Sequence, residues 1–388
     1  MLQGRPTSIN PDRDLNGIQI CARAAADVSF HIVSVDPDPI NQPSGSLKMT
    51  ACRACGTRQF IPQEVQPLET VSCTHCGQPV MMPLMLRQFE LRAAVGAGGM
   101  GTVYAAWDTR LHREVAVKLM RDELATDPVS MEQFTREARA CGGVNHTNII
   151  HIYTFDEHEG HHYLVMELAD RGSLDDRIEI EKRVPELAVL DIGIKVASAL
   201  ATALKHNLMH RDIKPGNILF NADGEPKLVD FGLAVSADVD ANYENTILGT
   251  PYYIAPERVQ RMKEDFRSDM YSLAGTLYHA ITGHVPFEAS TPQEVIMGHV
   301  EVELTPPNKV VPEITGMSSD ALARAMAKSP DERFASYDEF IMALTAARSH
   351  LLISQLNHEH MEGAHDDEPP PEVGAKKKTT GLLGWLKR

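Results

Sequence analysis

The chain has 388 residues, with 37 Lys and Arg residues against 53 Asp and Glu residues, so its formal net charge is −16. This length accommodates about two or three domains of ordinary size. The negative charge argues against a protein whose main partner is nucleic acid or an anionic membrane surface.

Targeting and membrane signals are absent from the sequence pattern. The N-terminus shows no charged-then-apolar signal segment. The longest apolar segment, Leu187–Leu204, carries Asp191 and Lys195, which disfavours a membrane span. These observations predict a cytoplasmic protein.

The first 47 residues are rich in Pro, Asp, Asn and Ser. Such a composition buries too little apolar surface to offset the entropy of folding. Val28–Val35 is apolar, but its alternation is too irregular to predict a strand. We expect residues 1–47 to be largely disordered.

Two Cys-x-x-Cys-Gly motifs follow within residues 48–83, and they contain Cys52, Cys55, Cys73 and Cys76. Each motif makes a tight turn that presents two thiolates to one ion, and two such turns complete the tetrahedral site of a structural zinc. The module resembles a zinc ribbon, which is too small to be stable without its metal. Paired disulfides are the alternative, disfavoured because a Cys-x-x-Cys disulfide is strained and the compartment is expected to be reducing.

The charge of this Cys module indicates which kind of partner it can bind. It holds the basic residues Lys48, Arg53 and Arg58 against Glu64 and Glu69. This balance gives little support to nucleic-acid binding. We therefore expect the module to contact protein or to regulate the domain that follows it.

A glycine-rich loop lies between two predicted strands, Phe89–Val95 and Thr102–Trp107. Glycines let backbone N–H groups approach the oxygens of a phosphate chain. The same pattern occurs in dinucleotide-binding folds, but there it opens a helix, whereas here a return strand follows. A plain flexible hairpin is the alternative without function. The loop residues are Gly96, Ala97, Gly98, Gly99, Met100 and Gly101.

Lys118 ends the alternating strand Val115–Lys118, where a buried charge requires anionic partners. A helix is predicted over Glu132–Cys141 and contains Glu137. Glu137 is a candidate partner of Lys118, and its alternative is a solvated helix carboxylate beside Arg136 and Arg139.

The sequence His210–Asn217, followed by Asp230–Gly232, contains acids, a lysine and an amide at the spacing that magnesium-assisted phosphoryl transfer needs. Either motif alone is a weak match. Together and in this order they resemble the catalytic and metal-binding loops of the protein kinase superfamily, in particular Hanks-type bacterial Ser/Thr kinases. Lys214 points to the Ser/Thr branch, because tyrosine-specific members usually lack it.

The resemblance implies an α+β fold of two lobes, β-rich above and helical below, over residues 87–352. Because the connection from Cys76 to the first predicted strand, which begins at Phe89, is short, we expect the ribbon to lie near the upper lobe. The resemblance also implies that Asp212 accepts the proton of the substrate hydroxyl and that Lys214 neutralises the moving phosphoryl group. Asn217 and Asp230 would ligate Mg²⁺, which prefers oxygen ligands. ATP would contact the glycine-rich loop, Lys118 with Glu137, and an adenine site made of Val103, Ala116, Leu219 and the backbone of Glu167 and Ala169.

The segment from Asp230 to Glu257 resembles a complete activation segment. By resemblance, Glu257 and Arg333 tie it to the lower lobe, and Asp269 braces the catalytic loop. Arg211 would pair with a phosphate on the segment. Thr246 is the best phosphate acceptor by position, with Ser236 and Tyr243 behind it; the alternative is a solvated loop threonine.

The predicted function is transfer of the ATP γ-phosphoryl group to Ser/Thr hydroxyls of protein substrates, switched by autophosphorylation. The alternatives are a nucleotide-binding pseudokinase scaffold acting through its ribbon, and a small-molecule kinase. Residues 353–388 are predicted to be a disordered tail. Its basic and apolar end, Lys376–Arg388, is a weak candidate for membrane or partner contact.

Overall fold

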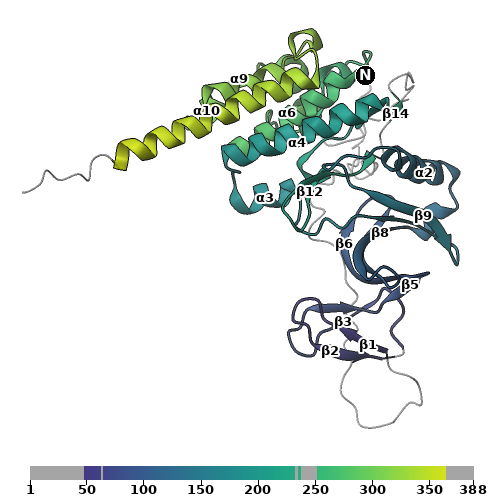
Figure 1. Cartoon of the computed structure of the whole chain (residues 1–388). Coiled ribbons are helices and arrows are strands. Elements are labelled where there is room, and N and C mark those ends of the chain that lie inside the picture. The colour runs from purple at the N-terminus through teal and green to yellow at the C-terminus, as the bar shows by residue number, and fades with distance from the viewer. Residues whose placement is uncertain (1–47, 63, 232–234, 237–250, 364–388) are drawn as a thin grey trace, which may run out of the picture.

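The computed structural model describes residues 48–363, except residues 63, 232–234 and 237–250. Within this part the chain forms a small Cys-bearing module, a lobe of strands and a lobe of helices (Figure 1). This is the α+β, two-lobed arrangement that the sequence predicted. The expectations for residues 1–47 and 364–388 lie outside the described residues.

The Cys-bearing module consists of two antiparallel hairpins. Strand β1 (Lys48–Ala51) pairs with β2 (Arg58–Ile61), and β3 (Thr70–Ser72) pairs with β4 (Pro79–Met81). We call residues 48–83 the ribbon. Its buried core is small and consists of Cys52, Ile61, Val65, Cys73, Val80 and Met82.

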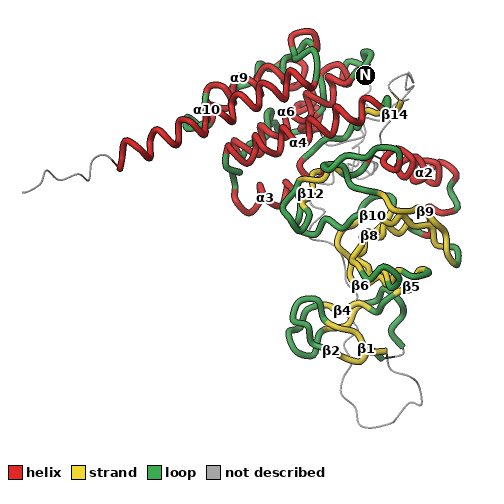
Figure 2. Tube along the Cα trace, in the orientation of Figure 1, coloured by secondary structure: helices red, strands yellow, loops and turns green. Residues whose placement is uncertain are grey.

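The upper lobe is a six-stranded antiparallel sheet with the order β5-β6-β7-β8-β10-β9 (Figure 2). The strands that flank the glycine-rich loop and the strand that carries Lys118 are present as predicted. The strands are β5 (Leu84–Leu86), β6 (Phe89–Ala97), β7 (Gly101–Asp108), β8 (Arg113–Met120), β9 (Ile152–His158) and β10 (His161–Met166).

Each face of this sheet packs against a different neighbour. On one face, Phe134 of helix α2 (Pro128–Gly142) joins Met120, Leu164 and Met166 in one buried cluster. On the other face, Tyr104 and its strand neighbours form a second cluster, which includes Met81 of the ribbon. The ribbon therefore contributes to the core of the upper lobe, as its short connection to the first strand suggested.

The lower lobe is helical and has one large apolar core, in which α4 packs against α6 and α10. Two short strand pairs, β12 with β13 and β11 with β14, flank the loops of the active site in the sequence. The helices are α3 (Leu174–Glu181), α4 (Glu186–Lys205), α5 (Pro256–Val259), α6 (Phe266–Thr282), α7 (Pro292–Glu301), α8 (Pro307–Val310), α9 (Gly316–Ala325) and α10 (Tyr337–Gly363). The strands are β11 (Leu208–Met209), β12 (Ile218–Phe220), β13 (Pro226–Leu228) and β14 (Val235–Ser236).

Helix α4 is the one described helix that is long and apolar enough to cross a membrane, by length and composition. Half of its most apolar window is buried inside the protein. Val196, Ala197 and Leu200 on this helix are all part of the lower-lobe core. Its apolar surface is therefore explained by packing.

Helix α10 differs from expectation at its C-terminal end. We expected an irregular tail from residue 353, but the helix continues to Gly363 and projects beyond the lower lobe (Figure 1). Residues 353–362 contain neither Pro nor Gly, so the backbone meets no residue that stops a helix before Gly363.

Candidate active site and metal centre

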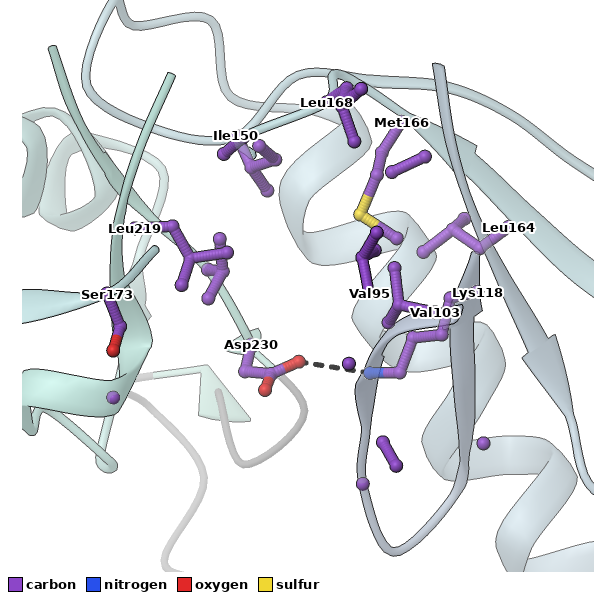
Figure 3. A pocket seen from close by; sticks show the side chains of 18 of the residues that line it. Val95, Val103, Lys118, Ile150, Leu164, Met166, Leu168, Ser173, Leu219 and Asp230 are labelled. Atoms are coloured by element: carbon purple, nitrogen blue, oxygen red, sulfur yellow. Dashed lines mark hydrogen bonds and ion pairs between the residues drawn. The ribbon is translucent and has the colours of Figure 1, made fainter. Parts of the chain in front are cut away.

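A cavity of about 650 Å³ lies between the two lobes, and most of the predicted nucleotide-binding residues line it. Figure 3 shows side chains from both lobes facing this space. Asn217 and Lys214 do not line it, and the side chain of Glu137, a residue of α2, lies outside the described part of the structure. The predicted residues in the lining are Gly96, Ala97, Gly98, Gly99, Met100, Gly101, Val103, Ala116, Lys118, Glu167, Ala169, Asp212, Leu219 and Asp230.

The glycine-rich loop joins β6 to β7 and covers the cavity from the upper lobe. Gly101 pairs with Met120 of β8, and a Cβ atom at Gly101 would overlap the carbonyl of Leu119. This position therefore requires glycine. At the tip, the Gly98 N–H donates to the Gly101 carbonyl at 2.8 Å, which closes the turn.

Lys118 and Asp230 meet inside the cavity, with 3.0 Å between Nζ and Oδ1 (Figure 3). Lys118 is the buried partner, while about half of the Asp230 side chain, 53%, is accessible from the open cleft. Burial acts to raise the pKa of Asp230, but the Lys118 ammonium outweighs it, so this pKa lies below its ordinary value of 3.8. Asp230 is therefore an ionised carboxylate at neutral pH.

In the catalytic loop, Lys214 and Asn217 both contact the carboxylate of Asp212. Lys214 Nζ lies 2.8 Å from Asp212 Oδ2. The Asn217 side-chain N–H donates to the Asp212 backbone carbonyl at 2.7 Å and to Oδ2 at 3.1 Å. Because the amide nitrogen of Asn217 is used in this way, its side-chain oxygen is available to a cation.

Two side chains, those of Asp269 and His210, hold the catalytic loop in place. Asp269 of α6 accepts the backbone N–H groups of His210 and Arg211 at 2.6 and 2.8 Å, as the resemblance implied. The His210 ring accepts the Asp212 N–H on Nδ1 at 3.2 Å, and its Nε2 lies 2.9 Å from the Val229 carbonyl. His210 thus links the catalytic loop to Val229, the residue before Asp230.

The hinge between the lobes contains a contact that the sequence interpretation missed. Lys227 Nζ of β13 lies 2.6 Å from Glu167 Oε1, and both side chains are largely buried. Because Glu167 begins the hinge and Lys227 lies three residues before Asp230, the pair connects the adenine site to the metal-binding loop. A lysine within the short apolar strand Pro226–Leu228 was the one available signal.

The end of the activation segment is tied to the lower lobe by a fully buried ion pair. Arg333 donates to both oxygens of Glu257, at 2.8 and 2.7 Å, and Ser268 donates to Glu257 Oε1 at 2.6 Å. Burial acts to raise the pKa of Glu257, but the Arg333 guanidinium outweighs it and lowers that pKa. The predicted structural pair is therefore present.

The comparison with known families matches residues 89–342 to the description "Protein kinase domain". The chain belongs to the protein kinase family. Its relatives include a probable serine/threonine-protein kinase of Clostridium perfringens, 35% identical over 66% of this chain and 37% of that protein. The serine/threonine-protein kinase PknB of Mycolicibacterium smegmatis is 31% identical over 77% of this chain and 52% of that protein.

A third relative of this chain is the serine/threonine-protein kinase PknL of Mycobacterium tuberculosis, 34% identical over 66% of this chain and 65% of that protein. The chain therefore spans between 37% and 65% of the length of these three relatives. All three come from bacteria.

Arg211, the residue before Asp212, is buried. Its Nε and Nη1 atoms have no hydrogen-bond acceptor among the described residues, and the Glu264 carboxylate is 3.9 Å away. Glu264 balances the charge of Arg211 at this distance but accepts no hydrogen bond from Nε or Nη1, and buried N–H groups without an acceptor are unfavourable. The predicted phosphate acceptor, Thr246, lies outside the described residues, as does Tyr243.

The four ribbon cysteines meet at one point, although the two motifs are far apart in the sequence. The four Sγ atoms lie within 4.8 Å of one another, with Cys52 and Cys76 at 3.6 Å and Cys55 and Cys73 at 3.7 Å. Zn–S bonds of about 2.3 Å at tetrahedral angles separate the sulfurs by about 3.8 Å. The arrangement fits a tetrahedral zinc ion, and these distances are too long for disulfides.

The backbone of each motif explains why the sulfurs converge. Gly56 and Gly77 both have a positive φ, and their N–H groups donate to the backbone carbonyls of Cys52 and Cys73, respectively. Among the four sulfurs, the Gln78 N–H favours the Cys76 thiolate, but burial and the other sulfurs outweigh it and raise the pKa of Cys76 to about 12. Without a cation, the four thiols cannot all ionise together.

Proposed function

We propose that the chain is a Ser/Thr protein kinase that transfers the γ-phosphoryl group of ATP to hydroxyl groups of protein substrates. The observation that carries this proposal is the convergence of Lys118, Asp212 and Asp230 on one cavity roofed by the glycine-rich loop. These groups come from both lobes and are far apart in the sequence. Phosphoryl transfer depends on such positioning of charge around the phosphates.

Each group of the chain has a separate task in this reaction. Asp212 accepts the proton of the attacking hydroxyl, and Lys214, 2.8 Å from that carboxylate, stabilises the charge of the moving phosphoryl group. Lys118 is held by Asp230 at 3.0 Å and exchanges this partner for phosphate oxygens when ATP binds. The adenine lies between Val103 and Ala116 above and Leu219 below.

The carboxylate of Asp230 and the side-chain oxygen of Asn217 suit Mg²⁺, a hard cation that prefers oxygen ligands. When bound there, Mg²⁺ neutralises negative charge on the ATP phosphates. The low pKa of Asp230 keeps this ligand ionised at neutral pH.

Activation by autophosphorylation is the second part of the proposal. Arg211 offers two buried nitrogen atoms, Nε and Nη1, whose N–H groups lack an acceptor among the described residues. A phosphate on Thr246 supplies oxygens with the charge that this guanidinium needs. We expect Thr246→Ala to lower activity toward added substrate and Thr246→Glu to restore it only in part, because a carboxylate carries less charge than a phosphate.

We also propose that Cys52, Cys55, Cys73 and Cys76 bind one structural zinc ion, and that the ribbon contacts a protein partner or regulates the kinase domain. The sulfur positions support a closed Cys₄ site with no open position for catalysis. A cytoplasmic location, where ATP is available and thiols stay reduced, remains a proposal. Any membrane or partner contact of Lys376–Arg388 lies outside the described residues.

Incubation of the purified protein with γ-labelled ATP and Mg²⁺ tests the activity. Phosphoamino acid analysis should find phosphoserine or phosphothreonine, and site mapping should find phosphate in the segment 232–250. Nucleotide binding without any transfer would favour the pseudokinase alternative. The intact set of Lys118, Asp212 and Asp230 argues against that alternative.

A further inference from the structure

The glycine-rich loop separates two cavities. Its inner side lines the nucleotide cavity, and Gly99 also borders a second cavity of about 620 Å³ on the outer side of the upper lobe. Arg121 lines the outer cavity and is not part of the lining of the inner one. It therefore approaches the loop from the side opposite to the nucleotide.

Arg121 makes two hydrogen bonds to the loop from one position. Its guanidinium Nη2 donates to the Gly98 carbonyl at 3.1 Å, and its backbone N–H donates to the Met100 carbonyl at 3.2 Å. Arg121 lies at the junction between β8 and the short helix α1 (Asp122–Ala125). The tip of the loop is thus anchored to the strand that carries Lys118.

The contact to the Gly98 carbonyl fixes the peptide bond between Gly98 and Gly99. In a trans peptide the C=O and N–H groups point in opposite directions. A carbonyl held toward Arg121 on the outer side therefore aims the Gly99 N–H toward the nucleotide cavity. In the described part of the chain, this N–H donates to no backbone carbonyl.

Without such a contact the peptide has little to orient it, because Gly98 and Gly99 both lack a Cβ atom and glycine accepts a wide range of backbone angles. Backbone N–H groups that converge on a concave site bind phosphate oxygens. The orientation that Arg121 selects is the one that presents the Gly99 N–H to such an oxygen.

We propose that Arg121 is a positioning residue for the phosphates of ATP, which acts through the Gly98–Gly99 peptide bond and does not itself touch the nucleotide. This inference rests on the proposed function, because it requires ATP in the cavity. Loss of the Arg121 side chain should therefore weaken the binding of the ATP phosphates and leave the binding of the adenosine part unchanged.

The test measures the Kd of ATP, ADP and adenosine by calorimetry with Mg²⁺, using the full chain. Arg121→Ala should weaken ATP binding by about 3- to 10-fold, the range of one ordinary hydrogen bond, because the Arg121 side-chain contact to Gly98 is exposed. It should raise the KM for ATP to the same extent and leave adenosine binding unchanged. Arg121→Lys retains a cationic donor and should recover part of the affinity.

The matched control is Arg110→Ala, which removes a positive charge from an exposed position in the β7–β8 turn, away from the loop. It should leave ATP binding unchanged. The ATP effect of Arg121→Ala should persist at about 0.5 M salt, because a hydrogen bond is screened less than a long-range charge effect.

Equal ATP affinity in Arg121→Ala and wild type would overturn the inference while leaving the proposed function intact. Equal weakening of ATP and adenosine would show a general structural defect, and equal weakening by Arg110→Ala would show a field effect; either result overturns it. If the wild-type chain fails to bind ATP, the proposed function fails first and the inference fails with it.

Discussion

The ribbon and the lower lobe are stabilised in different ways. The ribbon buries six residues in its own core, and two of them, Cys52 and Cys73, are zinc-ligand candidates. The lower lobe buries a continuous apolar core that extends from Val144 to Leu351. We therefore expect the ribbon to depend on the proposed zinc ion for its fold, whereas the lower lobe depends on apolar burial. Perturbations of metal and of core should therefore separate the two regions.

Removal of one zinc ligand should produce the largest effect. In Cys73→Ser, the ribbon should lose its metal and unfold, because structural zinc supplies on the order of 10 kcal/mol of folding free energy in such modules. Metal analysis should find one zinc per wild-type chain and little in the variant. Zinc-free wild-type protein, purified under reducing conditions without chelators, would refute the site.

The same variant also tests how separate the two regions are. Hydrogen exchange should show loss of protection in the ribbon while α4 and α6 stay protected. Chelation of the wild-type protein should reproduce this pattern. Loss of protection in α4 would mean that the lower lobe depends on the ribbon, contrary to the comparison.

Disruption of the buried pair Glu257–Arg333 should affect the lower lobe alone. Replacement of Arg333 by Met leaves a buried, uncompensated carboxylate and should cost about 3 to 5 kcal/mol of stability. Thermal unfolding and zinc content report on the two regions separately. For Arg333→Met we expect a lower melting temperature and an unchanged zinc content. An unchanged melting temperature would contradict the stabilising role of the Glu257–Arg333 pair.

Met81 lies where the ribbon packs against the upper lobe, and the effect of replacing it should be smaller. This side chain is 5% exposed within the upper-lobe cluster, so Met81→Ala should cost about 2 to 4 kcal/mol. Phe60 of the ribbon is 58% exposed, and Phe60→Ala is the control, expected to change stability by less than about 0.5 kcal/mol. Similar losses in both variants would show that burial at the junction is unimportant.

The folding stability of the lower lobe should depend on pH, because this lobe contains the buried histidines His279 and His299. Burial lowers the pKa of His279 to about 4 and that of His299 to about 3, from ordinary values near 6.5. Below pH 6.5 the unfolded chain binds protons at these sites and the folded chain does not, so stability falls as pH drops from 6.5 toward 4. Each histidine contributes up to about 1.4 kcal/mol per pH unit.

His279→Gln checks this assignment, because glutamine can still accept the hydrogen bond of Tyr253 that now reaches Nδ1 at 2.8 Å, yet does not titrate. Chemical denaturation between pH 7 and 5 should give a shallower decline for the variant. Parallel curves for variant and wild type would show that His279 does not carry the pH dependence.

The sequence predicted the parts of this protein in which chemistry fixes residue types at short spacing. Asp212, Lys214 and Asn217 lie within one loop, and Cys52 and Cys55 within one turn, so local spacing sufficed. The hairpin around the glycine-rich loop followed from strand alternation on both sides.

Contacts between distant segments could not be predicted in the same way. Lys227 and Glu167 pair only because β13 lies beside the hinge in the folded chain. The place of Met81 in the upper-lobe core depends on how the ribbon docks. Arg121 belongs to no motif in the sequence, and its hydrogen bonds to Gly98 and Met100 arise only in the folded chain.

The proposed function requires Asp212 to accept the proton of the Ser or Thr hydroxyl that attacks the γ-phosphorus of ATP. The most direct measurement compares transfer and ATP binding in wild type and in Asp212→Asn. Asn has nearly the same shape but cannot accept the proton, so transfer should fall at least ~10²-fold, the low end of what a positioned acid or base contributes. ATP binding should remain close to wild type, because Asp212 acts on the hydroxyl. Phosphate transfer by Asp212→Asn at the wild-type rate would contradict the account.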